Sequence, residues 1–212
     1  MKSDIFNRSS GLFVSTFALM FTGIVECIGI IESVTSEGTN KTFKVSSPIS
    51  HELKVDQSVS HNGVCLTVIE VFQNHHRVTA IDETLQKTNL KNWTMGTLIN
   101  LERCLKIGDR LDGHWVQGHV DCRGICVNVE DLNGSWEYTI QYEDADRFKT
   151  VEKGSITING ISLTVVDSQP GLLSVAIIPY TYEYTTMKDV LVGGEVNLEF
   201  DIIGKWVKAW MI

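Results

Sequence analysis

Basic residues are scarce in this 212-residue sequence, which has 18 lysines and arginines against 26 aspartates and glutamates and a formal net charge of −8 at pH 7. Affinity for nucleic acids rests mainly on basic side chains that neutralise phosphates. A nucleic acid is therefore not expected as a partner. Long apolar runs are also lacking: a membrane-spanning helix needs about 20 consecutive apolar residues, and the sequence has no such segment. We expect no membrane partner either.

Paired cysteines are lacking as well. The five cysteines are odd in number and form no C-x-x-C pair, which predicts reduced thiols in a cytoplasmic protein rather than a disulfide framework. Cys122 and Cys126 lie four positions apart with His119 nearby, but structural zinc sites use four ligands in short paired spacings. We expect no metal site. A Gly-rich phosphate loop is also missing, which argues against a flavin-dependent reductase with its dinucleotide-binding module.

The first 19 residues have no counterpart elsewhere in the sequence. Lys2 and Arg8 precede an apolar stretch at residues 11–19 and imitate a signal peptide, yet this stretch is short and interrupted by polar residues. No small-x-small cleavage site follows it. We predict that residues 1–19 are a disordered extension, or that translation starts at Met20.

What the sequence does contain is an internal repeat. Residues 58–68 (SVSHNGVCLTV) return as residues 155–165 (SITINGISLTV) at an offset of 97 positions. Residues 23–29 (GIVECIG) match residues 118–124 (GHVDCRG) at an offset of 95 positions. Solenoid repeats have periods of roughly 20 to 50 residues. The longer period therefore predicts a duplicated domain of about 95 residues, which is large enough to bury a core.

Short β-branched runs between turn signals predict an all-β fold. The predicted strands are residues 24–31, 42–45, 64–71, 77–81 and 98–101 in the first copy and residues 124–129, 136–142, 155–158, 161–166, 173–178 and 195–200 in the second. About six strands per copy favour a small closed antiparallel barrel, because closure removes exposed strand edges. Short helical patterns occur at residues 48–53, 83–90 and 143–151, and an amphipathic helix with Trp206 and Trp210 on one face is predicted at residues 204–212.

Three segments of each copy are expected to meet at one rim of its barrel, where small residues and backbone amides can accept a flat polar ring. They are residues 23–25, 64–66 and 79–84 in the first copy and residues 118–120, 162–164 and 176–181 in the second. Each copy then holds one ligand of the same kind. The copies differ at Cys65 against Ser162 and at His119 against Ile24, and a pure binding module gains nothing from such differences.

Structural interpretations compete for the same residues. Cys65 lies between two apolar residues of a predicted strand and fits a buried small hydrophobe. The pairs at residues 62–63 and 159–160 are both Asn-Gly, which is typical of hairpin turns. His114 and His119 are five positions apart and point to opposite faces of an extended strand, so at most one of them faces a ligand.

Five motifs follow one another along the sequence: residues 20–26 (MFTGIVE), 62–68 (NGVCLTV), 113–121 (GHWVQGHVD), 159–165 (NGISLTV) and 200–205 (FDIIGK). Together they resemble the riboflavin synthase family of the alpha-chain type, from Met20 to the C-terminus. The resemblance implies two tandem six-stranded antiparallel Greek-key barrels, the lumazine-binding barrels, at residues 20–112 and 113–203. It also implies a C-terminal oligomerisation helix at residues 204–212.

The resemblance implies an activity as well. In this family two molecules of 6,7-dimethyl-8-ribityllumazine dismutate: one gives a four-carbon unit to the other, and the products are riboflavin and 5-amino-6-ribitylaminouracil. No cofactor is implied, because both carbon fragments come from the substrate. A cytoplasmic homotrimer is implied, with each active site between the N-terminal barrel of one chain and the C-terminal barrel of its neighbour, as is an association with lumazine synthase.

Carried over by position, the substrate-binding residues are Gly23, Ile24, Val25, Val64, Cys65, Leu66, Thr79, Ala80, Ile81, Asp82, Glu83, Thr84, Gly118, His119, Val120, Lys153, Ser162, Leu163, Thr164, Ala176, Ile177, Ile178, Pro179, Tyr180 and Thr181. Val64 stands where some relatives have a second cysteine, which leaves one thiol in that segment.

The reaction requires a nucleophile that adds at ring carbon 7 of the acceptor and a base that takes a proton from the 7-methyl group of the donor. The candidate catalytic side chains are Cys65, Ser58, His119, Ser162 and Asp201. His119 is the leading acid–base group, because the ordinary pKa of histidine lies near neutrality. Water is an alternative nucleophile.

A non-catalytic lumazine carrier, like the lumazine proteins of luminous bacteria, is the competing hypothesis. Such carriers resemble the same duplicated barrel and need only the N-terminal pocket. This sequence keeps residues 159–164, Lys153 and Thr181 in its second copy, which favours the enzyme.

Overall fold

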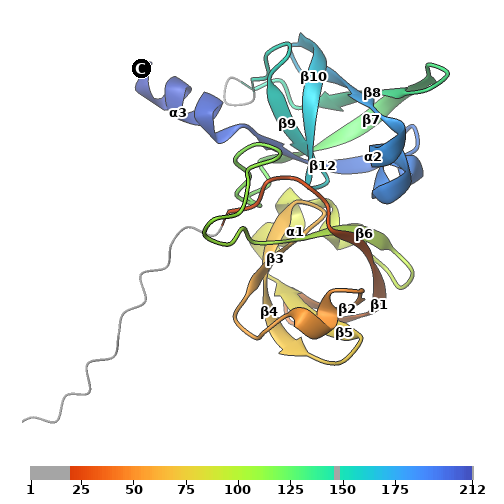
Figure 1. Ribbon diagram of the computed structural model, residues 1–212, viewed down its shortest axis with the longest axis vertical. Helices are drawn as coiled ribbons and strands as arrows, with labels where there is room; N and C mark the ends of the chain where they lie inside the picture. The colour runs from red at the N-terminus through yellow and green to blue at the C-terminus, as the bar shows by residue number, and fades with distance from the viewer. Residues whose placement is uncertain (1–19, 146–148, 212) are drawn as a thin grey trace, which may run out of the picture.

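The computed structural model describes residues 20–145 and 149–211. The extension predicted at residues 1–19 lies outside the described residues. The described chain forms two closed six-stranded barrels of antiparallel strands, stacked on each other, with few helices (Figure 1). This confirms the predicted fold class. Within the described residues, no helix has the length and apolar character that a membrane span requires.

The N-terminal barrel consists of β1 (Cys27–Glu37), β2 (Asn40–Ser46), β3 (Ser58–His61), β4 (Val64–Val71), β5 (His75–Ala80) and β6 (Leu98–Arg103). Their order around the barrel is β1-β2-β5-β4-β3-β6. Strands β3, β4 and β5 pair in sequence while β2 pairs with β5, which is a Greek key. The 3₁₀ turn η1 (Ser50–Glu52) precedes β3, and α1 (Asp82–Lys87) and η2 (Asn89–Asn92) precede β6.

The C-terminal barrel repeats this plan. Its strands are β7 (Cys122–Asp131), β8 (Trp136–Tyr142), β9 (Ser155–Ile158), β10 (Ile161–Gln169), β11 (Leu172–Ile177) and β12 (Glu195–Phe200). Their order around the barrel is β7-β8-β11-β10-β9-β12, which is equivalent to the order in the first barrel. Helix α2 (Pro179–Tyr184) and the turn η3 (Thr186–Asp189) correspond to α1 and η2. Helix α3 (Ile202–Trp210) projects away from the barrel (Figure 1).

Two predictions on local structure are wrong. No strand is predicted at Ser58–His61, because its sequence is polar, yet these residues form β3 and all four are buried. A helix is predicted at residues 143–151, but the described residues 143–145 and 149–151 form none. Hydrogen bonds to β10 hold this connection instead: Thr150 Oγ1 lies 2.6 Å from Ser168 Oγ, and the Ser168 hydroxyl donates to the Thr150 carbonyl at 3.0 Å.

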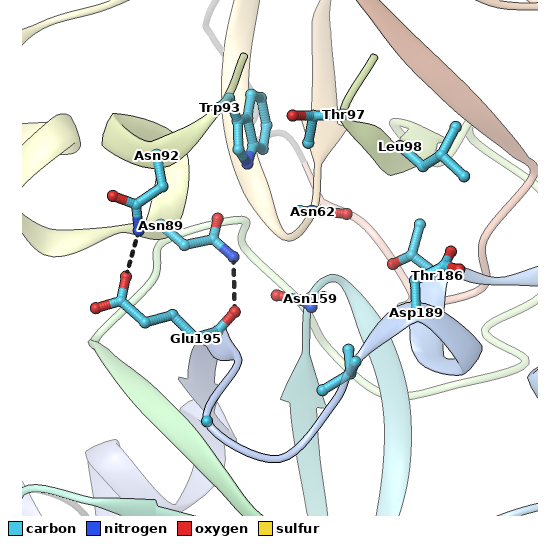
Figure 2. Close-up of a pocket in the computed structure, with 12 residues that line it drawn as sticks. Asn62, Asn89, Asn92, Trp93, Thr97, Leu98, Asn159, Thr186, Asp189 and Glu195 are labelled. Atoms are coloured by element: carbon cyan, nitrogen blue, oxygen red, sulfur yellow. Dashed lines mark hydrogen bonds between the residues drawn. The ribbon is translucent and has the colours of Figure 1, made fainter. Parts of the chain in front are cut away.

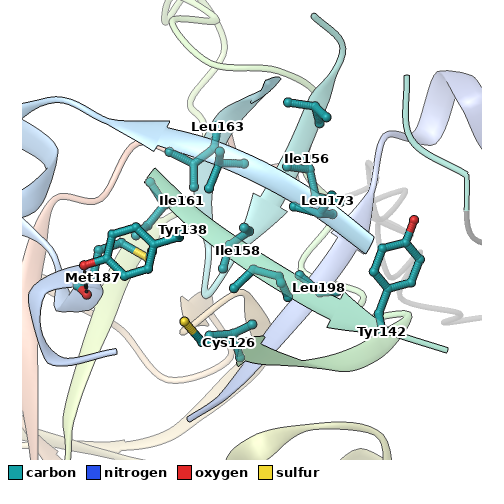
Figure 3. Packing of buried hydrophobic residues seen from close by; sticks show 14 of the residues in the cluster. Cys126, Tyr138, Tyr142, Ile156, Ile158, Ile161, Leu163, Leu173, Met187 and Leu198 are labelled. Carbon is teal, nitrogen blue, oxygen red and sulfur yellow. Dashed lines mark hydrogen bonds between the residues drawn. The ribbon is translucent and has the colours of Figure 1, made fainter. Parts of the chain in front are cut away.

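Inward-facing residues of successive strands fill the barrel interiors. In the C-terminal barrel, Ile156, Ile158, Leu173 and Leu198 converge on the centre and are fully buried (Figure 3). Tyr138 fits among them because its hydroxyl donates to a backbone carbonyl, that of Met187, at 2.9 Å. A buried tyrosine with a satisfied hydroxyl contributes a large apolar surface without an unpaired polar atom.

The N-terminal barrel instead buries a chain of polar groups. His61 Nδ1 lies 2.9 Å from the Val59 carbonyl, His61 Nε2 lies 3.0 Å from His76 Nε2, and His76 Nδ1 lies 2.9 Å from Ser50 Oγ. A carbonyl only accepts, so His61 carries its proton on Nδ1. Its Nε2 then accepts from His76, and His76 accepts from the Ser50 hydroxyl. Both imidazoles are therefore neutral in the folded protein.

Reciprocal asparagine bonds join the two barrels. The side-chain amide of Asn100 donates to the Asn159 carbonyl at 2.9 Å, and that of Asn197 donates to the Asn62 carbonyl at 2.9 Å. Asn100 is the repeat equivalent of Asn197, and Asn62 is that of Asn159. An approximate twofold axis therefore relates the two bonds. The Asn-Gly pairs at residues 62–63 and 159–160 are hairpin turns, as predicted, and they also form the junction between the barrels.

The buried histidine pair predicts acid sensitivity. Burial lowers the pKa of His61 to about 3 and of His76 to about 4, whereas the unfolded chain takes up these protons near pH 6.5. The contribution of the two neutral histidines to the free energy of unfolding is therefore complete above pH 6.5 and is lost as the pH falls towards 4. We expect His61→Ile/His76→Leu, which installs the residues found at Ile158 and Leu173, to make the thermal midpoint less dependent on pH between 6.5 and 4. An unchanged pH dependence would contradict this origin.

Candidate functional site

Two extended segments pass between the barrels. The first arm, residues 20–26, precedes the N-terminal barrel, and the second arm, residues 113–121, precedes the C-terminal barrel. The two arms pair with each other: the Phe21 N–H donates to the Val116 carbonyl at 2.7 Å, and the Val116 N–H donates back at 3.1 Å. Both residues are fully buried. The first arm is the red segment at the junction in Figure 1.

Each arm contacts the barrel that it does not precede. The Gly23 carbonyl accepts from the Ser162 N–H of β10 at 2.8 Å, and the Gly118 carbonyl accepts from the Cys65 N–H of β4 at 2.8 Å. A Cβ on Gly23 would lie 2.6 Å from the Ser162 nitrogen, and one on Gly118 would lie 2.7 Å from the Cys65 Cβ. Only glycine permits this approach.

The side chains follow the same exchange. Val25 packs against the C-terminal core, and Val120 packs against the N-terminal core. The repeat predicts that residues 23–25 meet the Cys65 segment of their own copy, and this prediction is wrong. Because the arms pair with each other at the junction, each crosses to the other barrel before its own barrel begins.

A buried carboxylate holds the first arm. Glu102, near the end of β6, accepts from the N–H and the hydroxyl of Thr22, each at 2.7 Å, and from the Gly23 N–H at 2.9 Å. All three donors belong to the arm. The bonds set the position of the Gly23 carbonyl, which in turn receives the Ser162 N–H.

Glu199 of β12 holds the second arm in the same way. It accepts from the backbone N–H groups of Gln117 at 2.7 Å and His119 at 3.0 Å. Burial raises the pKa of both Glu102 and Glu199 to about 7, against the arm hydrogen bonds, which lower it. The two carboxyl groups therefore titrate near neutral pH, where an ordinary glutamate is fully ionised.

The first cluster of candidate side chains gathers around Cys65. Its thiol is half-buried, and burial raises its pKa, while a hydrogen bond with Ser58 lowers it and the charge of Glu199 raises it further. The exposed side chain of His119 follows Gly118, whose carbonyl binds the Cys65 N–H. Cys65 and Ser58 are thus brought together, and the backbone just before His119 lies against Cys65. A raised pKa keeps Cys65 a neutral thiol at pH 7, which is a poor nucleophile.

The second cluster gathers around Ser162. Its hydroxyl lies 2.7 Å from His114 Nδ1, and His114 Nε2 lies 3.1 Å from the Thr157 hydroxyl. Burial lowers the pKa of His114, and the charge of Asp201 opposes this shift. The lowered pKa favours the neutral imidazole, which shares a hydrogen bond with the Ser162 hydroxyl. Asp201, which caps α3 by accepting from the Ile203 N–H at 2.9 Å, acts electrostatically on this cluster.

Strand register brings the third predicted segments to the same places. In the N-terminal barrel Val68 pairs with Val78, so the start of β4 lies beside the end of β5 and the start of α1. In the C-terminal barrel Val165 pairs with Val175, and the start of β10 lies beside the end of β11 and the start of α2. Each barrel therefore presents two of its own segments and one arm segment from the other copy.

Lys153 lies in the turn before β9, with a φ of 64° and an exposed side chain. Its N–H donates to the Val165 carbonyl at 2.9 Å, which places it beside β10. Across the described ranges, no three histidine, cysteine, aspartate or glutamate side chains are grouped so that they could hold a metal ion.

Three residues of the sites escape sequence reasoning. His114 receives no role from the sequence, because nothing there shows that it meets Ser162. Glu102 and Glu199 stand at equivalent positions of the repeat. The recurrence of a glutamate directly after an apolar strand residue in both copies was the signal, since a buried carboxylate needs a set of donors.

Comparison with known proteins divides the chain into the same two barrels. A family model described as "Lumazine binding domain" matches the chain twice, over residues 22–104 and 117–201. Each match spans one barrel, so the chain carries two lumazine-binding domains.

Among its curated relatives is "Riboflavin synthase" of Bacillus subtilis (strain 168), 34% identical over 193 residues, which covers 91% of this chain and 90% of the relative. Another is that of Mycobacterium tuberculosis (strain ATCC 25618 / H37Rv), 38% identical over 198 residues, which covers 91% and 98%. The chain belongs to the riboflavin synthase family, and it is an enzyme of that family.

Solved structures agree on the architecture. LumP complexed with 6,7-dimethyl-8-(1'-D-ribityl) lumazine matches with a TM-score of 0.78 at 20% sequence identity, covering 85% of this chain and 99% of that chain. LumP complexed with riboflavin matches with a TM-score of 0.79, also at 20% identity, covering 85% and 98%. At this identity the likeness concerns the fold alone.

Attachment of the first arm should depend on pH. The pKa of Glu102 is about 7 in the folded protein and near 4.5 in the unfolded chain. The contribution of the protonated carboxyl group to the free energy of unfolding is therefore complete below pH 4.5 and is lost as the pH rises through 7. A shift of this size corresponds to about 3 kcal/mol. Glu102→Gln does not ionise, and its amide nitrogen faces an arm donor. We expect it to lower the thermal midpoint, and the deficit to shrink between pH 5 and pH 8.

The matched control is Glu37→Gln at the exposed end of β1, which should shift the midpoint by the same small amount at every pH. Circular dichroism melts at several pH values measure both variants. A Glu102→Gln deficit that is constant or grows with pH would contradict the proposed ionisation.

Proposed function

We propose that the protein catalyses the dismutation of two molecules of 6,7-dimethyl-8-ribityllumazine to riboflavin and 5-amino-6-ribitylaminouracil by transfer of a four-carbon unit. The observation that carries this proposal is the pair of clusters around Cys65 and Ser162, each completed by an arm from the other copy. The sequence similarity to riboflavin synthases over 91% of the chain supports it. A lone functional pocket would not need the second cluster.

The chemistry explains why two similar but unequal sites are useful. Donor and acceptor are the same compound, so two related pockets can bind them, but one molecule must lose a proton while the other receives a nucleophile. Both carbon fragments come from the substrate, and no outside oxidant or reductant is required. Holding two flat rings in register converts a bimolecular encounter into an effectively unimolecular step, worth up to about 7–11 kcal/mol.

The proposed roles differ between the clusters. In the first, we assign the proton transfer to His119, whose side chain is exposed and whose backbone is fixed by Glu199 next to the residue that binds the Cys65 N–H. Cys65 and Ser58 contact the ring as neutral hydrogen-bonding groups. In the second, Ser162 contacts the other ring. Asp201 acts at the edge of this cluster, and the nucleophile is Ser162 or water.

Substrate contacts are proposed for the segments that the register and the arms bring together. Around the first cluster they are Val64, Cys65, Leu66, Thr79, Ala80, Ile81, Asp82, Glu83, Thr84, Gly118, His119 and Val120. Around the second they are Gly23, Ile24, Val25, Lys153, Ser162, Leu163, Thr164, Ala176, Ile177, Ile178, Pro179, Tyr180 and Thr181. The assignment of residues 23–25 to the second cluster follows from the arm exchange.

We further propose a homotrimer in which each active site lies between the N-terminal barrel of one chain and the C-terminal barrel of the next. Helix α3 supports an assembly role. Ile203, Trp206, Val207 and Trp210 form an apolar stripe, and all four are exposed. A cytoplasmic location and an association with lumazine synthase remain expectations from the family.

Incubation of the purified protein with 6,7-dimethyl-8-ribityllumazine alone should yield riboflavin without added cofactor or metal. His119→Gln should lower turnover about a hundredfold or more, as expected for loss of an acid–base group, because it removes the imidazole and keeps the backbone bond to Glu199. Lumazine affinity should change by no more than about twofold. Absorbance of riboflavin gives turnover, and fluorescence titration gives affinity.

The control is Trp115→Phe, an exposed position on the same arm to which no role is assigned. It should turn over like the parent. A carrier of the LumP type would bind lumazine with a full signal and form no riboflavin, and this outcome would replace the enzymatic proposal. Full turnover by His119→Gln would withdraw the role of His119 alone.

The assembly proposal predicts that Trp206→Glu/Trp210→Glu gives monomers in sedimentation velocity, since two charges would be buried in an apolar interface. Helix α3 is anchored independently by the Lys205–Asp121 ion pair at 2.6 Å, so the barrels should stay folded. Ile107→Glu, at an exposed apolar residue outside the helix, is the control and should remain a trimer. A trimeric double variant would exclude α3 from assembly.

A further inference from the structure

A cavity of about 470 Å³ lies at the junction of the two barrels, away from both arm clusters. Its walls come from both copies: the turn at Asn62, η2 and the start of β6 on one side, and the turn at Asn159, η3 and the start of β12 on the other (Figure 2). The cavity therefore lies on the approximate twofold axis. Its size falls in the range of small-molecule sites, about 300–1,000 Å³.

The two turn asparagines present free donors to this cavity. Asn62 Oδ1 accepts from the Asn100 N–H at 2.7 Å, and Asn159 Oδ1 accepts from the Asn197 N–H at 2.8 Å. Among the described residues, neither Nδ2 has a hydrogen-bond partner. The oxygen of each side chain is thus fixed by the fold, and its amide nitrogen is left for something else.

The two halves of the wall differ at several equivalent positions, and one of these differences leaves a hydroxyl without a partner among the described residues. Asn89 Oδ1 accepts from Asn197 Nδ2 at 3.0 Å, and Asn89 Nδ2 donates to the Glu195 carbonyl at 3.2 Å (Figure 2). The equivalent residue of the second copy is Thr186, which is too short to make these bonds. Its side chain is 4% exposed, and its hydroxyl has no partner in the described structure. An unpaired buried hydroxyl is costly and calls for an explanation.

The remaining lining limits what the occupant can be. Asp189 and Glu195 contribute carboxylates, and no lysine or arginine is among the lining residues, so an anion is disfavoured. Leu98, Trp93 and Val190 supply apolar wall. The occupant should be uncharged, with an apolar body and one polar edge.

We propose that this cavity binds an uncharged heterocycle through a cyclic imide edge, which is an N–H flanked by two carbonyl groups. The amide nitrogens of Asn62 and Asn159 donate to the two carbonyl oxygens, and the Thr186 hydroxyl accepts from the N–H. The site offers two donors and one acceptor, and an imide offers the complement. This site is separate from the arm clusters and does not rest on the proposed reaction.

A ligand bound in the cavity would affect the positions of both clusters. The turn at Asn62 leads directly into β4 and Cys65, and the turn at Asn159 leads directly into β10 and Ser162. A ligand that bridges the two turns fixes the spacing between these strands. The cavity is therefore placed to couple the two copies.

Uracil is the smallest probe with this edge. Uracil is titrated into the full-length protein while amide NMR shifts are followed separately at the two turns and at the arm clusters. We expect saturable shifts at the two turns, with a dissociation constant of about 1 mM for so small a ligand. 3-Methyluracil, which lacks the imide N–H, should bind at least about tenfold more weakly.

Two isosteric variants test the contacts. Asn159→Asp keeps the oxygen that accepts from Asn197 and removes the amide donor, and Thr186→Val removes only the hydroxyl. Each should weaken uracil at least about tenfold. Thr186→Val should also leave the ligand-free thermal midpoint unchanged or higher, because no protein partner is lost. Asn92→Asp, whose side chain bonds Glu195 at the rim, is the control for added charge and should retain binding within about twofold.

The outcomes decide the proposal. Absence of uracil binding, or uracil-induced shifts confined to the arm clusters, overturns it, since the cavity would then hold solvent only or the probe would occupy the arm clusters. Equal affinity of uracil and 3-methyluracil, or unchanged affinity in Asn159→Asp and Thr186→Val, overturns the imide geometry. Lumazine turnover, measured separately on the same variants, shows whether the proposed reaction stands independently of this result.

Discussion

The hydrogen bonds from each arm to the opposite barrel are the constraint on which the sites depend. Gly23 accepts from Ser162 and Gly118 accepts from Cys65, so both candidate clusters contain backbone from the two copies. The barrels cannot separate without dismantling both clusters at once. Everything else at the junction, including the buried carboxylates and the asparagine bonds, keeps these two contacts in register.

The backbone at the junction is nearly symmetric, and the side chains on it are not. Equivalent carbonyls receive equivalent N–H groups, yet the thiol of Cys65 faces Ser58 whereas the hydroxyl of Ser162 faces His114. A symmetric frame presents the same ligand in comparable orientations. Unequal side chains then give the two ligands different proton chemistry, which a reaction between identical molecules requires.

The repeat and the strand pattern predict the two barrels from the sequence. Turns and alternation are local signals, and the offset of 97 residues can be read directly by comparing the two copies. The arm exchange is invisible to the same information. An alignment of residues 23–29 with residues 118–124 shows that they are equivalent, but not which copy of Cys65 or Ser162 each one meets. That depends on a crossing at the junction, where buried Phe21 and Val116 pair.

Residues with buried polar functions were missed for a related reason. The Ser-Val-Ser-His stretch that forms β3 looks like a loop, because its polar side chains find partners only in the folded barrel. His61 meets His76 from β5, fifteen positions away. Glu102 meets an arm eighty positions away. Sequence periodicity records burial of apolar residues, and it does not record a partner at such a distance.

The exchange also constrains what one copy could do alone. A single barrel with its arm would have a Gly-containing arm that lacks an opposite barrel, and a β4-like strand that lacks an arm. Two such copies related by a twofold axis would satisfy each other, because the same patch would face itself. The present chain joins the two copies covalently, and this frees each copy to change alone. Cys65 and Ser162, or Asn89 and Thr186, could not differ in a symmetric pair of identical chains, so the fusion is what permits one site to differ from the other.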